Sequence, residues 1–77
     1  MLETIHIRLD YPLNHVKEPI LYHLVKDYRL VPNIYQANID VHIGGMLVLT
    51  IEGKPDDVQA GIAFLRGLGI TTTVLGD

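Results

Sequence analysis

Histidines are the residues of this chain best suited to acid–base or metal chemistry, and there are four of them: His6, His15, His23 and His42. Serine and cysteine are absent, which excludes a serine–histidine–aspartate triad, a cysteine nucleophile, and thiolate-bound zinc or iron–sulfur clusters within the chain. Strand alternation predicts His6 and His42 on one sheet face, near Asp40. A metal site needs three or four converging ligands, so we interpret these as solvated histidines and predict no catalytic residue, no metal and no cofactor.

Two glycine-containing stretches are also candidates, because glycine-rich loops can cradle phosphates. Gly44-Gly45 lacks the spacing G-x-x-x-x-G-K-[ST] and does not lead into a helix. Gly53-Lys54-Pro55 is too short for such a loop. We interpret the first as a hairpin turn, where glycine accepts a positive φ, and the second as the turn before a helix.

Composition narrows the function classes further. The chain has 77 residues and a net charge of −3, so it lacks the basic surface that nucleic acids or anionic membranes require. Its hydrophobic content of 48% and charged content of 19% exclude intrinsic disorder. No stretch approaches the ~20 apolar residues of a membrane span, and the N-terminus does not resemble a signal peptide. We expect one small cytoplasmic domain, for which a partner subunit would add stability.

A strand and a helix are predicted in the first part of the chain. Residues 4–10 alternate apolar and polar, which is typical of a half-buried strand, with the odd-numbered apolar residues toward the core. A loop follows at 11–14. A helix begins at Glu18-Pro19, because proline fits the first helical turn, and ends at Val31-Pro32. Its apolar residues form one stripe: Ile20, Leu21, Leu24, Val25 and Tyr28.

Two strands joined by a tight turn are predicted next. Residues 33–43 form an extended stretch, in which strict alternation divides the side chains between two faces. One face is predicted to hold Tyr35, Ala37, Ile39, Val41 and Ile43, and the other Ile34, Gln36, Asn38, Asp40 and His42. Gly44-Gly45 makes the turn, and residues 46–52 return as a strand apolar enough for a central place in a sheet.

A second helix and a last strand complete the order. The helix begins near Pro55, where Asp56 and Asp57 complement the positive end of its dipole. Leu68-Gly69 ends it, and residues 70–75 are β-branched, which favours a strand. The order predicts an α+β, ferredoxin-like βαββαβ fold, a four-stranded antiparallel sheet with two helices on one face. The other face of the sheet is then uncovered.

This fold supports unrelated functions, and each requires its own residues. An RNA-binding version stacks bases on exposed aromatic residues of two central strands, which the strands at 4–10 and 46–52 lack. A metal-chaperone version needs paired cysteines. An acylphosphatase-like version needs an arginine in a glycine-rich loop, where this chain has Asp10-Tyr11-Pro12-Leu13. A binding or interaction module remains.

The chain resembles the NIL domain family over about residues 3–75. The resemblance rests on the order and spacing of these segments: Glu18-Pro19-Ile20, Leu24-Val25, Asn33-Ile34-Tyr35, Gly45-Met46-Leu47-Val48-Leu49, Gly53, Ala60, Ile62, Leu65 and Gly69. The family takes its name from an Asn-Ile-Leu motif that opens the second strand, and this chain has Tyr35 at the third position. It is therefore identified as a single NIL-type domain over residues 1–77.

The resemblance implies a regulatory function. NIL domains lie at the C-terminus of the ATPase subunits of methionine ABC importers, where they pair across subunits, bind methionine and hold back transport. Others are fused ahead of iron–sulfur ferredoxin domains. The predicted hairpin is shorter than the importer type implies, and the chain begins at Met1 without an ATPase segment, which favours the ferredoxin-fused type.

We therefore expect a non-catalytic homodimer that senses an amino acid such as methionine and acts on an attached ABC ATPase or redox domain. The alternative is a protein–protein interaction module of a NIL-ferredoxin protein that binds no small ligand.

Two sets of residues follow from these expectations. Asn33 is the ligand-side residue by the resemblance, since an asparagine can donate to a carboxylate and accept from an ammonium group; alternatively it caps the preceding loop. The predicted ligand-binding residues are Asn33, Ile34, Tyr35, Pro19 and Ile20. The predicted dimer interface on the uncovered face comprises Met46, Val48, His6, Arg8, Asp40 and His42, and the β-branched strand at 71–74 offers an alternative edge for pairing.

Overall fold

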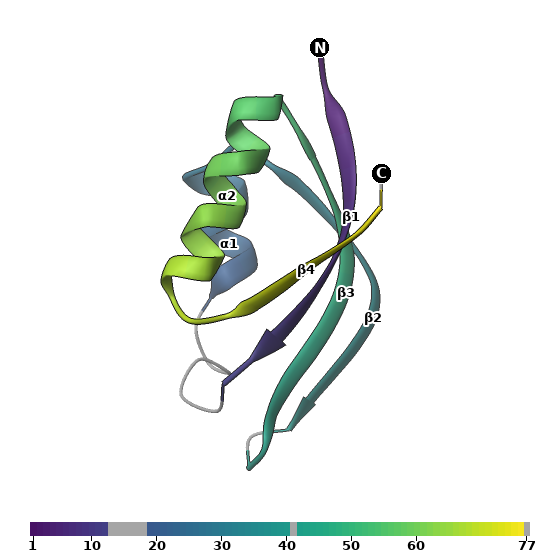
Figure 1. Cartoon of the computed structure of the whole chain (residues 1–77), viewed down its shortest axis with the longest axis vertical. Coiled ribbons are helices and arrows are strands. Elements are labelled where there is room, and N and C mark those ends of the chain that lie inside the picture. The colour runs from purple at the N-terminus through teal and green to yellow at the C-terminus, as the bar shows by residue number, and fades with distance from the viewer. Residues whose placement is uncertain (13–18, 41, 77) are drawn as a thin grey trace.

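The computed structural model describes residues 1–12, 19–40 and 42–76, and its elements follow the predicted order. They are β1 (Glu3–Tyr11), α1 (Ile20–Lys26), β2 (Val31–Asp40), β3 (Gly44–Gly53), α2 (Pro55–Gly67) and β4 (Thr71–Gly76). The strands form one antiparallel sheet in the order β2-β3-β1-β4. Both helices cover the same face of this sheet, and the β2–β3 hairpin extends past their ends (Figure 1). The predicted ferredoxin-like fold is confirmed.

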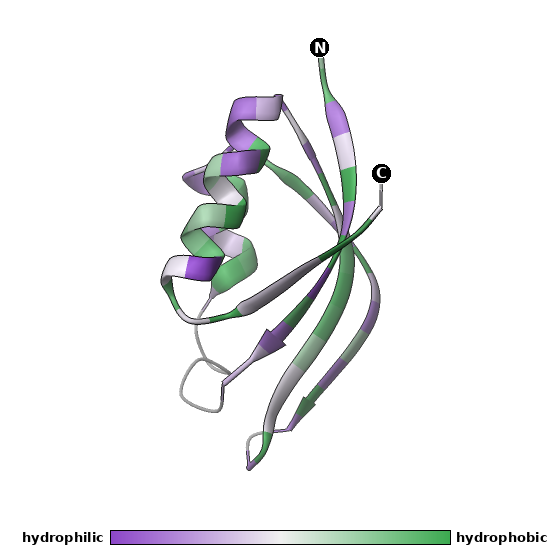
Figure 2. Cartoon of the chain, in the orientation of Figure 1, coloured by the Kyte–Doolittle hydropathy of each residue, from purple (hydrophilic) through white to green (hydrophobic). Residues whose placement is uncertain are grey.

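The core lies between the helices and the two central strands. Leu47, Leu49 and Ile51 alternate along β3 toward the helices, and β3 is coloured as hydrophobic over much of its length in Figure 2. The predicted two-residue period of β1 is likewise confirmed, since Ile7 and Leu9 are fully buried. The remaining buried apolar side chains are Ile20, Leu24, Leu30, Val58, Ile62, Leu65 and Ile70.

The second helix follows its sequence signals closely. Pro55 occupies the first turn together with Asp56 and Asp57, as predicted. Gly69 has a φ of +85°, a left-handed conformation that glycine adopts without strain and that ends the helix. Gly61 is buried on the inner side of α2, where Leu30 occupies the space that a larger side chain would need.

The first helix is shorter than predicted. It ends at Lys26, and the chain turns back through Arg29, which has a φ of +57°. Val25 is 52% exposed, so the predicted stripe is wrong at this position. Leu24 lies about 40° around the helix axis from the buried Ile20, whereas Val25 lies about 140° from it and faces away from the core. The predicted loop residues 13–14 and the predicted start at Glu18 lie outside the described residues.

The second strand departs from the predicted alternation. It begins at Val31, so Val31-Pro32 opens a strand and does not end a helix. Ile34 lies opposite Leu49 and Gln36 opposite Val48, which leaves Tyr35 as an extra residue in a β-bulge. The bulge exchanges the predicted faces of two residues. Ile34 shares the helix-covered face with its partner Leu49. Tyr35 lies beside His6 on the opposite face of the sheet, which neither helix covers and which we call the open face.

The hairpin turn lies earlier than predicted. Gly44 and Gly45 pair with Asp40 and Ile39, so both glycines belong to β3 and the turn precedes them. An Asp40 carboxylate oxygen accepts a hydrogen bond from the backbone N–H of His42 at 2.7 Å, which stabilises the turn. The predicted extension of the strand to Ile43 is therefore wrong, and Val41 lies outside the described residues.

Candidate functional site

A hollow of about 330 Å³ opens between α1 and β2, on the helix-covered side of the sheet. Among the residues that the structure describes, its lining carries no charged side chain, and the polar side-chain groups there are two tyrosine hydroxyls. Its lining residues are Tyr11, Pro19, Ile20, Leu21, Tyr22, Ile34, Ala37, Ile39 and Leu47. An apolar hollow with a few polar groups at its wall is the usual form of a small-molecule site.

Four elements build the hollow. Ile20 and Leu47, both buried, come from α1 and β3. The β2 bulge turns Ile34 into the wall, where it remains 51% exposed. Ile39 lies against Gly45, because a Cβ at that glycine would lie only 3.1 Å from Ile39 Cγ1. The absence of a side chain at position 45 therefore lets Ile39 lie across the neighbouring strand.

Tyr11 supplies one of the two polar groups. It ends β1 and packs against the core. Burial raises the pKa of its phenol above 10.0, because an apolar environment disfavours the phenolate. The hydroxyl is therefore neutral at physiological pH and can both donate and accept a hydrogen bond.

The predicted ligand-binding residues divide between two faces of the sheet. Pro19, Ile20 and Ile34 come together in the hollow. Asn33 lies opposite Thr50 on the open face, and Tyr35 lies on the same face. The five residues thus do not line one cavity.

The predicted interface residues also fall into two groups. Arg8 lies opposite Val48, and His6 and Met46 share the same open face. Arg8 makes a two-pronged ion pair with Asp10, with Nη2 to Oδ1 at 3.1 Å and Nε to Oδ2 at 3.2 Å. The open face is thus largely polar, and Met46 and Val48 are only half-buried within it.

Asp40 and His42 lie elsewhere, at the tip of the hairpin. Asp40 pairs with Gly44, whereas His6 pairs with Thr50, and a strand rises ~3.3 Å per residue. His42 is therefore about 20 Å from His6 along the sheet, and the predicted grouping of the two histidines is wrong. Within the described ranges, no three histidine, aspartate or glutamate side chains gather closely enough to hold a metal ion.

The lining residues that sequence reasoning missed are Tyr11, Leu21, Tyr22, Ala37, Ile39 and Leu47. Two of them, Ala37 and Ile39, lie on β2, which is an edge strand in the described sheet. Large apolar side chains on this strand are about half exposed or more: Val31, Ile34, Tyr35 and Ile39. Such exposure along an edge strand marks a binding or pairing surface.

Among the residues that the structure describes, neither helix is long and apolar enough to cross a bilayer.

The family model "NIL domain" matches residues 5–74 of the chain. A methionine import ATP-binding protein MetN from Protochlamydia amoebophila is 32% identical over 72 residues, which are 90% of this chain and 21% of that protein. MetN from Vibrio cholerae serotype O1 is 30% identical over 73 residues, with 91% and 21% covered. The chain thus spans about a fifth of the length of these relatives.

Among solved structures, the fold is similar to the C-terminal domain of an ABC transporter ATP-binding protein from Enterococcus faecalis. The TM-score is 0.80 at 29% identity, and the match covers 95% of this chain and 84% of the other.

Proposed function

This chain belongs to the NIL domain family, and we propose that it is a non-catalytic, cytoplasmic regulatory domain that binds a small amino acid such as methionine. The observation that carries the proposal is the apolar hollow between α1 and β2. Pro19, Ile20 and Ile34 all belong to the segments that resemble the family, and they meet in this hollow. Two of the similar proteins are named for methionine import, which supports methionine as the first ligand to test.

The chemistry of the hollow suits an uncharged, flexible side chain. Its volume of about 330 Å³ lies at the small end of the range for ligand sites. A thioether chain would contact Ile20, Ile34 and Leu47, and apolar burial would drive its binding. The Tyr11 hydroxyl provides a neutral hydrogen-bonding group at the wall. The charged ends of the amino acid would remain toward the opening.

Regulation would act through a second copy of the chain. In the sheet that the described residues form, β2 is an edge strand with exposed apolar side chains on both of its faces, a combination that favours strand pairing. A ligand with higher affinity for one dimer arrangement would shift the population toward it, typically by 1–3 kcal/mol of coupling. The attached domain that responds would be an ATP-binding domain, as in the similar transporter proteins; an attached ferredoxin stays a prediction.

Thermal unfolding with and without L-methionine tests the ligand. A ligand at a hundredfold excess over its dissociation constant stabilises by about 2.7 kcal/mol, which corresponds to a rise of about 10 to 20 °C in the midpoint of so small a domain. Ile34→Ala should remove most of this rise, because it opens the wall of the hollow. Val74→Ala is the matched control: Val74 is 49% exposed, against 51% for Ile34, and lies on the opposite edge strand.

Asn33→Ala distinguishes a ligand site in the hollow from a ligand site on the open face. Loss of the methionine effect in this variant, with Ile34→Ala unaffected, would move the site to the open face. If neither methionine nor another natural amino acid raised the midpoint of thermal unfolding, the proposed ligand binding would be wrong, and a pure interaction module would be favoured.

A further inference from the structure

We propose that His6 is a positioning residue for the hollow, although it lies on the opposite face of the sheet. Through its contact with Tyr35, His6 holds the β2 bulge in place, and the bulge keeps Ile34 in the wall of the hollow. This inference rests on the proposed function in that the hollow is the ligand site. The position of the bulge can nevertheless be measured without any ligand.

The bulge decides which side chain enters the hollow. In the observed register Ile34 faces Leu49 and Gln36 faces Val48, with Tyr35 left over. Without the bulge, the pairing of residues 36–40 would continue unbroken toward the start of the strand. Tyr35 would then oppose Leu49 and face the helices, and Ile34 would move to the open face. The strand therefore has two competing registers, which differ in the residue that lines the hollow.

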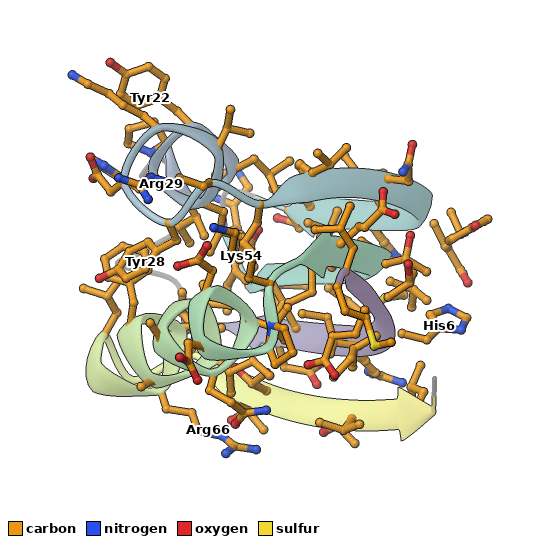
Figure 3. All side chains as sticks on the ribbon, turned by 90° about the horizontal axis from the view of Figure 1, so that it is seen from above. His6, Tyr22, Tyr28, Arg29, Lys54 and Arg66 are labelled. Atoms are coloured by element: carbon orange, nitrogen blue, oxygen red, sulfur yellow. The ribbon has the colours of Figure 1, made fainter. Side chains whose placement is uncertain are left out.

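The contact with His6 favours the bulged register. The rings of His6 and Tyr35 have centroids 5.5 Å apart at an interplanar angle of 52°, a geometry typical of attractive ring pairs. Figure 3 shows His6 projecting from the side of the sheet away from the helices. This contact exists only while Tyr35 is on the open face, so it stabilises the bulge and not the alternative.

The His6 ring contributes surface and no hydrogen bond at its inner nitrogen. Nε2 of His6 is buried and has no hydrogen-bond partner among the described residues. A buried nitrogen without a partner destabilises the fold, so a ring without that nitrogen should serve as well or better. We therefore expect phenylalanine at position 6 to hold Tyr35 in place as histidine does, and a polar residue there not to.

The coupling runs in both directions. A ligand in the hollow would favour the register with Ile34 in the wall and would thereby hold Tyr35 against His6. A partner that covers Tyr35 on the open face would in turn raise ligand affinity in the hollow. The two faces of the sheet would then communicate through a single extra residue.

The first test is ligand-free NMR on His6→Ala, His6→Phe and the control Thr4→Ala. Thr4 is exposed and lies two residues from His6 on the same face of β1. The wild type, Thr4→Ala and His6→Phe should show nuclear Overhauser effects between Ile34 and Ile20. His6→Ala should weaken them and should bring the Tyr35 ring close to Leu49, its cross-strand neighbour in the register without the bulge. Tyr35→Ala, which alters a side chain that is 68% exposed, serves as a second variant in case His6→Ala does not fold.

The second test is methionine affinity by calorimetry. We expect His6→Ala and Tyr35→Ala to lose affinity by up to about three- to tenfold, the upper limit set by one aromatic contact, with recovery in His6→Phe. An unchanged bulge in His6→Ala would overturn the proposal, whether or not methionine binds. A shifted bulge with no methionine binding to the wild type would leave the positioning role standing and would overturn the proposed ligand.

Discussion

Substitution of Gly61 by alanine should destabilise the domain, although the same change in an ordinary helix stabilises it. Alanine is better than glycine inside a helix by about 0.8–1.0 kcal/mol. At position 61, however, a Cβ would lie 2.6 Å from Leu30 Cδ1 and 3.4 Å from Leu24 Cδ2. Leu30 cannot move away easily, because it is 1% exposed and its Cδ2 already occupies the space above Gly53 that a side chain there would need.

The helix propensity of alanine and its clash with Leu30 change the free energy of unfolding in opposite directions. Overpacking of a core costs about 1–3 kcal/mol, so the net effect of Gly61→Ala should be a loss of about 0–2 kcal/mol. Gly67→Ala is the control in the same helix, since a Cβ there meets nothing within 4 Å. It should be neutral or stabilising by up to about 1 kcal/mol.

Urea unfolding measures both variants. In a Leu30→Ala background the clash is absent, so Gly61→Ala should become stabilising, and the double-mutant cycle should give a coupling of about 1–3 kcal/mol. If Gly61→Ala alone stabilised the domain as much as Gly67→Ala, Leu30 would have room to move, and the explanation of Gly61 would be wrong.

Two further predictions concern pH and assembly. Burial raises the pKa of Tyr11 above its unfolded value of 10.0. The contribution of the neutral phenol to the free energy of unfolding is therefore fully present below pH 10 and is lost as the pH rises toward the folded pKa. Tyr11→Phe should flatten this decline in alkaline thermal melts. Sedimentation equilibrium at micromolar concentration should show a dimer that Ile39→Lys, at the edge strand, converts to a monomer while Val48→Lys, on the open face, does not. The opposite pattern would place the dimer contact on the open face, and an 8.6 kDa species alone in the wild type would exclude a dimer.

The elements with local signals were predictable from the sequence. Pro55 and Gly69 mark the two ends of α2, and the alternation in β1 and β3 identifies their buried sides. The end of α1 had no such signal, because Arg29 adopts a positive φ that sequence patterns associate with glycine or asparagine. Pro32 also misled, since proline is tolerated near the start of an edge strand.

The candidate site was only partly predictable, because one non-local feature divides it. Strict alternation assigns Tyr35 to the same face as Ala37 and Ile39, which is the register without a bulge. The bulge depends on cross-strand pairing with Leu49 and Val48 and on the contact between Tyr35 and His6, which are 29 positions apart in the sequence. Patterns within one segment cannot report such contacts.

The Asn33-Ile34-Tyr35 motif is divided between the two faces of the sheet. This placement bears on the one position at which the motif differs from the Asn-Ile-Leu pattern of the family. Tyr35 stands where leucine is usual, and a departure inside the ligand pocket would cast doubt on the ligand. Tyr35 does not line the hollow, however; of the three motif residues only Ile34 does. The substitution therefore alters the open face directly, where the ring meets His6 at 5.5 Å, and it affects the hollow only through the position of the bulge. Differences among NIL domains at this third position should accordingly change the surface that a partner meets, and they should change ligand affinity only where they shift the bulge.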